Sequence, residues 1–346
     1  MFNFDPSTFE QKETLKNHPH IRIYHDAPSG SSFVLKKSCC DENYNRFFGK
    51  IKESVFLFNL DHPSFVPIQG YHIQDDNELS IYTKMQLFEG ASNIREFIED
   101  HLKANNQISE EEIVKVLYNL AWGLDYLHSK KILHQNLEPS SIIIDKGGYA
   151  RILDMSLSTL IPQEQSLTPM FLESKELGHY HAPELYHSEE EKIANADLLK
   201  TDIWSLGIII LEMCLLETEI MSHIAISSIQ ESHLSDIFTR IEEKERYDPH
   251  LIKIVKSMLC VDITQRCTTK EILQNIRENL SQFLTLKQKK YETKSEIIKS
   301  IDGEFDHLLE EREQSHRASA CFDFTKDELS SKEEEQWNIL YFQQSI

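Results

Sequence analysis

The residues best equipped for chemistry lie in segment 132–156, ILHQNLEPSSIIIDKGGYARILDMS. Two short apolar runs predict two β-strands, and two glycines between them predict a tight turn, because glycine tolerates the positive φ angles that such a turn needs. Polar and acidic groups flank both strands. These groups are His134, Asn136, Glu138, Ser141 and Asp154. Other motifs are located by their distance along the sequence from this segment.

The order of these residues resembles the catalytic loop of protein kinases. Residues 133–144 follow the pattern His-Arg-Asp-Leu-Lys-Pro-x-Asn ahead of an apolar strand, and residues 152–156 resemble the metal-binding Asp-Phe-Gly segment. The chemistry that the resemblance implies is phosphoryl transfer from ATP, for which positioning and electrostatic stabilisation supply most of the catalysis.

The side chains at the reacting positions depart from that pattern. Asn136 stands in the position of the catalytic base Asp, and the loss of a positioned base typically costs ~10²–10⁴ in rate. Glu138 replaces the lysine that would contact the transferred phosphate, and Ser141 replaces the asparagine that would hold a second magnesium. Gln135 replaces an arginine that in many members contacts a phosphorylated loop, whereas Met155 can fill the apolar position of the phenylalanine.

Other residues of the nucleotide site are kept. Lys36 matches the lysine of the family's Val-Ala-Ile-Lys strand. Glu53, nine residues before His62, falls where the family places the partner of that lysine. Asp154 matches the main magnesium ligand. These residues could hold a nucleotide with one metal, or they could form a salt-bridge network between two lobes. The second interpretation is slightly favoured because Glu138 opposes phosphates.

Of the two segments expected to surround a nucleotide, the hinge is compatible with binding and the phosphate-covering loop is not. The hinge that would meet an adenine is predicted at Lys84, Met85 and Gln86, after Thr83, which is small enough to leave a pocket open. The phosphate-covering loop, predicted over residues 14–21, contains no glycine. Side chains there obstruct the approach of backbone amides to phosphates. The resemblance implies ATP with magnesium as the ligand, and these departures predict weak binding.

Architectural motifs of the same family follow in order. Residues 180–184 resemble the Ala-Pro-Glu segment, and residues 201–207 resemble the start of the family's central helix, with Asp202 at its fixed position. Arg266 lies where the family has an arginine that pairs with the glutamate of the first motif, here Glu184. His134 is expected to brace the loop as a framework residue of the family, and Asp202, Glu184 and Arg266 are expected to be architectural residues.

Hydrophobic periodicity predicts the elements that position these residues. The first 85 residues are rich in strands, with an antiparallel pair near 21–24 and 32–36 and two more strands near 66–73 and 79–85. Apolar residues recur at helical spacing over 44–59. Further along, Ser109 and Glu112 form a capping box that opens a helix leading to His134. The nearly continuous apolar run 201–216 predicts a buried central helix.

Together these patterns predict an α+β, two-lobed protein-kinase-like fold. We expect an N-lobe over residues 1–85, a C-lobe over 86–285, and an acidic, partly helical tail over 286–346. The tail ends in an apolar cluster, residues 337–342, that either docks on the domain or binds another molecule.

Composition limits the partners. With 36 Lys and Arg against 57 Asp and Glu, the net charge of −21 argues against nucleic acid and anionic membranes as ligands. The longest apolar run is too short to span a bilayer. Six cysteines without a Cys-x-x-Cys pair indicate neither a zinc site nor a disulfide framework. We therefore expect a reducing, intracellular location, in the cytoplasm or the nucleus.

Three functions are compatible with the sequence. The favoured hypothesis is a pseudokinase, a regulatory or scaffold protein that binds another protein, for example an active kinase. The second is an atypical but active Ser/Thr protein kinase. The third is a nucleotide-sensing module whose shape depends on ATP.

Overall fold

A computed structural model of the chain describes most of the segment from residue 9 to residue 284, within one compact unit, Phe4–Leu284. The described residues are 9–14, 21–26, 30–39, 54, 57, 60–75, 79–155, 158–160, 178–186, 195–224 and 229–284. Of the helix expected over 44–59, only Ser54 and Leu57 are described, and both are helical. The expected tail lies outside the described residues and stays a prediction.

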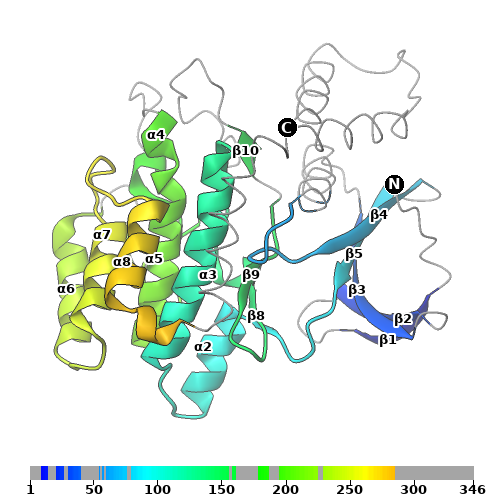
Figure 1. The fold of residues 1–346 in the computed structure, drawn as a ribbon, viewed down its shortest axis with the longest axis horizontal. Coiled ribbons are helices and arrows are strands. Elements are labelled where there is room, and N and C mark those ends of the chain that lie inside the picture. The colour runs from blue at the N-terminus through cyan, green and yellow to red at the C-terminus, as the bar shows by residue number, and fades with distance from the viewer. Residues whose placement is uncertain are drawn as a thin grey trace. The chain divides into compact units, whose positions relative to one another are not determined.

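The N-lobe contains a five-stranded antiparallel sheet with the strand order β1-β2-β3-β5-β4 (Figure 1). Its strands are β1 (Glu10–Thr14), β2 (Ile21–Asp26), β3 (Ser31–Cys39), β4 (Ile68–Asp75) and β5 (Leu79–Gln86). The predicted antiparallel pairing of β2 with β3 is confirmed. We did not predict β1, because the sequence EQKET is polar and has no apolar alternation. Its pairing with β2 makes it a strand.

Strand register determines which side chains share a face of this sheet. Lys36 on β3 pairs with Thr83 on β5, so both side chains point to the same face. The Thr83 hydroxyl lies 2.6 Å from the Ser54 hydroxyl. The helical segment that carries Ser54 therefore packs on the face that bears Lys36.

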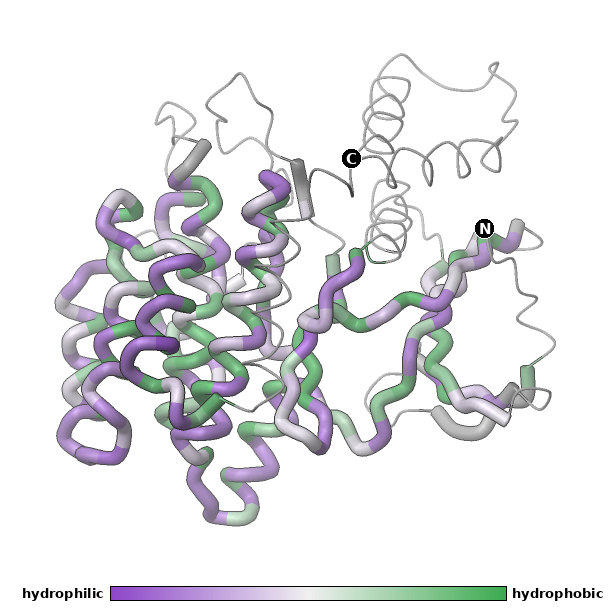
Figure 2. Tube along the Cα trace, in the orientation of Figure 1, coloured by the Kyte–Doolittle hydropathy of each residue, from purple (hydrophilic) through white to green (hydrophobic). Residues whose placement is uncertain are grey.

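The C-lobe is helical. Its helices are α2 (Ile94–Lys103), α3 (Glu110–Ser129), α4 (Asn195–Leu198), α5 (Lys200–Leu215), α6 (Glu231–Glu242), α7 (Pro249–Met258) and α8 (Thr269–Asn279). The capping box is confirmed, because the Glu112 amide donates to Ser109 Oγ at 3.3 Å and the Ser109 amide donates to Glu112 Oε2 at 2.9 Å. Hydrophilic and hydrophobic residues alternate along most of these helices (Figure 2), as expected for helices with one buried face.

The predicted central helix is α5, and it is buried along nearly its whole length. Gly207 allows its close approach to the segment after α7, since a methyl group there would lie 2.8 Å from Leu259 Cδ2. The helix ends at Leu215, and the following residue, Leu216, has a left-handed φ of 60°. No helix among the described residues combines the length and apolar character needed to cross a bilayer.

Short strands form two small sheets next to the loop, with the strand orders β10-β7 and β6-β8-β9. They are β6 (Ser92–Asn93), β7 (Ile132–Leu133), β8 (Ile142–Ile144), β9 (Ala150–Ile152) and β10 (Thr159–Leu160). The predicted hairpin is β8–β9, and Gly148 in its turn has φ of 75°. Single-turn 3₁₀ helices occupy Pro139–Ser141, Pro183–Tyr186 and Ser281–Phe283. A β-sheet N-lobe and a helical C-lobe confirm the predicted α+β class.

Candidate functional site

Asp202, in the first turn of α5, accepts hydrogen bonds from the backbone at the start of the loop. It is 1% exposed and accepts three hydrogen bonds, each at 2.9 Å, from the His134 amide, the Gln135 amide and His128 Nε2. Burial opposes its ionisation, but these donors outweigh burial and hold the pKa of Asp202 below its usual range. Gln135 has φ of 66°, a left-handed conformation that a side chain disfavours. Asp202 therefore stabilises a backbone that is strained.

His134 forms the centre of the loop. Its ring is fully buried, and burial lowers the pKa of the imidazole despite the nearby Asp202 and Asp154 carboxylates. The Asn136 amide donates to His134 Nδ1 at 3.3 Å, and the buried Ser158 hydroxyl donates to the His134 carbonyl at 3.3 Å. A neutral histidine thus braces the backbone that presents Asn136.

The substituted positions in the loop hydrogen-bond to one another. Ser140 Oγ donates to the Glu138 carboxylate. Ser141 Oγ donates to the Glu138 carbonyl at 2.8 Å and also accepts from the Glu138 amide at 3.1 Å. A longer bond of 3.4 Å joins the same hydroxyl to the Asn136 carbonyl. Ser141 is 4% exposed, so its hydroxyl closes the 3₁₀ turn of the loop.

Asp154 follows β9 and is partly buried. The Leu153 amide donates to the Ser141 carbonyl at 2.8 Å, which places this segment beside the loop. Met155 is completely buried in the main core, as expected for a residue that replaces phenylalanine. Among the described residues, no group of three or more His, Cys, Asp or Glu side chains is arranged to hold a metal ion. The Ser141 hydroxyl bonds to backbone groups of the loop, and Asp154 as a magnesium ligand stays a prediction.

The nucleotide-site candidates of the N-lobe lie on β3 and β5. Lys36 is half-buried on β3, and Glu53 lies outside the described residues. Lys84, Met85 and Gln86 are the last residues of β5 and still pair with neighbouring strands. Lys84 Nζ lies 4.1 Å from the centre of the Phe33 ring, whereas Thr83 and Met85 are buried. The chain leaves the sheet only after Gln86.

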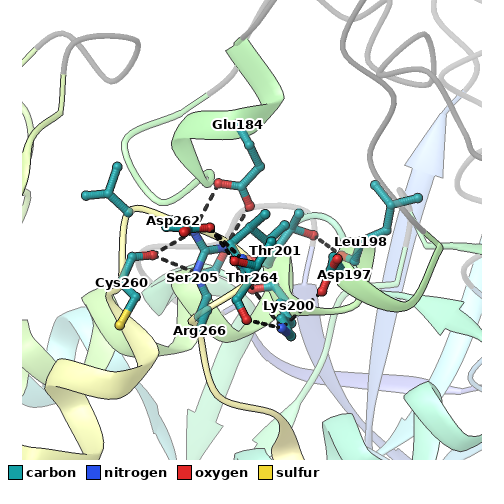
Figure 3. A network of polar contacts seen from close by, with 12 residues as sticks. Glu184, Asp197, Leu198, Lys200, Thr201, Ser205, Cys260, Asp262, Thr264 and Arg266 are labelled. Carbon is teal, nitrogen blue, oxygen red and sulfur yellow. Dashed lines mark hydrogen bonds and ion pairs between the residues drawn. The ribbon is translucent and has the colours of Figure 1, made fainter.

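Arg266 and Glu184 come together as the motif spacing suggested (Figure 3). Arg266 is 2% exposed, and its two terminal nitrogens donate to the Glu184 carboxylate at 2.6 and 3.0 Å. The guanidinium also donates to the carbonyls of Cys260 and Lys200. The ion pair therefore links the Pro183–Tyr186 turn, α5 and the segment that precedes α8.

A second buried carboxylate was not assigned a role from the sequence. Tyr180 donates to both oxygens of Glu212, at 3.1 and 3.3 Å, and the Ile220 amide donates to one of them at 3.2 Å. Arg95, on α2, pairs with the adjacent Glu219 at 2.9 Å. The sequence shows only that a glutamate lies inside an otherwise apolar run. It does not show which residues hydrogen-bond to that glutamate. The role of His128 was also missed, because its partner Asp202 lies far away in the sequence.

Glu212 should make stability depend on pH. Burial raises its pKa from 4.5 to about 7 against the opposing hydrogen bonds from Ile220 and Tyr180. A raised carboxyl pKa gives stability that is present below pH 4.5 and is lost as pH rises to 7. Since glutamine cannot ionise, Glu212→Gln should be more stable than the unchanged chain at pH 8, by up to about 3 kcal/mol, with little difference at pH 4.5.

Urea unfolding at pH 4.5 and pH 8 measures this difference. Glu242→Gln is the matched control, because Glu242 is exposed on α6 and its partner is the exposed Lys256. Parallel pH profiles for Glu212→Gln and the unchanged chain would contradict the prediction.

Comparisons with known proteins agree with this geometry. The protein kinase domain family model matches residues 24–276. The probable serine/threonine-protein kinase MRK1 homolog of Encephalitozoon cuniculi (strain GB-M1) is 32% identical over 187 residues, 52% of this chain and 51% of its own. Serine/threonine-protein kinase Nek11 of Homo sapiens is 28% identical over 249 residues, 70% of this chain and 35% of its own. The chain thus spans about half or less of these relatives. It belongs to the protein kinase family.

Proposed function

We propose that this chain is a pseudokinase that regulates or scaffolds another protein by binding it. The observation that supports this proposal is the loop at residues 134–141. Its framework bonds, centred on Asp202, are kept, while Glu138 and Ser141 bond to the loop itself. Asn136 offers an amide where the family uses a carboxylate base. In this proposal the loop keeps its framework, while Asn136, Glu138 and Ser141 replace the family's base, lysine and asparagine.

The proposed partner is a protein, for example an active protein kinase. The net charge of −21 favours a partner with a basic surface. We also propose a reducing intracellular location, in the cytoplasm or the nucleus, because the cysteines show no disulfide or zinc pattern.

Phosphate transfer tests the proposal directly. The full chain, incubated with radiolabelled ATP, magnesium and a generic protein substrate, should transfer no more label than its Asp154→Ala variant. Label that Asp154→Ala abolishes would instead support an atypical active Ser/Thr kinase, an alternative favoured by the kinase names of the relatives. If the unchanged chain transfers no label but the double variant Asn136→Asp and Glu138→Lys does, those two positions are the main defects.

Thermal unfolding separates the scaffold from the nucleotide sensor. A ligand at 100 times its Kd adds about 2.7 kcal/mol of stability, whereas the scaffold hypothesis expects no change with Mg-ATP. Lys36→Ala is the matched variant, because Lys36 is the described candidate for contacting phosphates. A shift that is present in the unchanged chain and lost in Lys36→Ala would support the nucleotide-sensing alternative.

A further inference from the structure

The sheet of the N-lobe has a second face, opposite the face that bears Lys36. Side chains alternate between the two faces along a strand, so the neighbours of Lys36 on β3, Leu35 and Lys37, point to this second face. Leu35 pairs with Arg22 on β2 and with Lys84 on β5, and residues paired in this way share a face. Because β2, β3 and β5 are adjacent (Figure 1), three cations surround Leu35.

An apolar floor lies between these cations. Leu35 and Phe33, two positions apart on β3, are both buried. The Phe33 ring stacks with the Tyr24 ring at 6.0 Å between centroids, and it meets the Phe9 ring edge-on at 4.7 Å. These rings fix the floor in place. Interfaces between proteins are enriched in aromatic residues and arginine, so this composition is typical of a binding surface.

Two of the cations lie against aromatic rings. Lys84 Nζ is 4.1 Å from the centre of the Phe33 ring, and Lys37 Nζ is 5.7 Å from the centre of the Tyr82 ring. In the part of the chain that the structure describes, neither Lys84 nor Arg22 forms an ion pair with a carboxylate. Lys84 is partly exposed and Arg22 is exposed. An anionic ligand can therefore pair with both charges.

In the register of β3, β4 and β5, no acidic residue falls on this face. The whole chain, in contrast, carries 57 acidic residues against 36 basic ones. Charges are screened over about 8 Å at physiological ionic strength, so the local cations rather than the net charge decide which ligand this face attracts. We call this surface the basic face, formed by Arg22, Phe33, Leu35, Lys37 and Lys84.

We propose that the basic face is a docking surface for an acidic segment of a protein partner. Glutamate or aspartate carboxylates of that segment pair with the three cations, and an apolar side chain covers the floor at Leu35. The acidic remainder of the chain still favours basic groups elsewhere on the same partner. This inference rests on the proposed function of binding another protein, and it can fail separately, because phosphate transfer does not depend on this face.

Fluorescence anisotropy with a labelled acidic peptide tests the docking surface. The probe is a short peptide that alternates pairs of glutamates with phenylalanine, and it is titrated with the full chain at physiological salt. The unchanged chain should bind this peptide. The double variant Lys37→Gln and Lys84→Gln should bind it about tenfold more weakly, the combined effect expected for the loss of two exposed ion pairs.

Lys253→Gln combined with Lys270→Gln is the matched control. These two lysines are exposed on α7 and α8, and the net charge changes by the same amount, so peptide binding should stay the same. Equal weakening in both double variants would reject the docking surface, since general attraction would then explain the binding. It is also rejected if the unchanged chain does not bind the peptide, or if a peptide with glutamine in place of glutamate binds as tightly.

Carbodiimide cross-linking locates the peptide on the unchanged chain and needs no substitution, so it decides the question even where a variant does not fold. The reagent joins a carboxylate of the bound peptide to a neighbouring lysine amine, and mass spectrometry identifies that lysine. Cross-links should form at Lys37 and Lys84. Their absence at both lysines, with cross-links at C-lobe lysines such as Lys253 or with none, would overturn the proposal.

Discussion

Replacing Arg266 with alanine should lower the free energy of unfolding by about 3–5 kcal/mol, the usual cost of leaving one charge of a buried pair without its partner. The variant leaves the Glu184 carboxylate and the Cys260 and Lys200 carbonyls without their donor. It also removes a guanidinium that lies 5.0 Å from the centre of the buried Trp204 ring. Urea unfolding of the purified variant at pH 7 measures the loss.

Two controls separate the ion pair from simple loss of side-chain volume. Arg240→Ala removes an exposed ion pair on α6 and should cost no more than about 1 kcal/mol. Glu184→Ala combined with Arg266→Ala should cost less than the sum of the two single changes, because each single change leaves a charge unpaired. If Arg266→Ala were as mild as Arg240→Ala, the pair would not stabilise the fold.

Replacing Asp202 with alanine should destabilise the chain by a similar amount, about 3–5 kcal/mol. The change leaves the His134 and Gln135 amides and His128 without their acceptor inside the protein. It also frees Gln135 to leave its left-handed conformation, so the loop should relax. Chemical unfolding gives the global cost, and hydrogen exchange at residues 134–141 gives the local one.

Asp202→Asn tests the role of charge at the same position. An asparagine keeps one acceptor oxygen, so it should cost less than alanine while still weakening the loop. Equal exchange at residues 134–141 in the unchanged chain and in Asp202→Ala would show that the loop does not depend on this carboxylate.

The sequence predicted an element correctly where the types and the spacing of neighbouring side chains together indicate one local structure. The antiparallel pairing of β2 with β3, the capping box at Ser109 and the buried α5 follow from local patterns and were predicted. The meeting of Arg266 with Glu184 followed from family motifs. In contrast, β1 depends on a neighbouring strand, and the Tyr180–Glu212 contact depends on where a helix meets a turn. Such contacts join residues far apart in the chain, so local patterns do not show them.

Within the site, Ser141 shows what could not be predicted from the sequence. From its position, the sequence indicates only that a metal ligand has been lost. The structure adds that the hydroxyl bonds to backbone groups of Asn136 and Glu138, and neither composition nor spacing could show this. The predicted pairing of Lys36 with Glu53 stays a prediction, because Glu53 lies outside the described residues.

The hydrogen bonds within the loop bear on how easily evolution could reverse its substitutions. Mutating Glu138 alone to lysine would remove the acceptor of Ser140, and mutating Ser141 alone to asparagine would disturb a buried turn. Each lost bond costs about 0.5–1.5 kcal/mol, and a single reversion would still leave Asn136 in place of a base. Each of these single changes would therefore cost hydrogen bonds of the loop, so selection for stability would tend to keep the present loop.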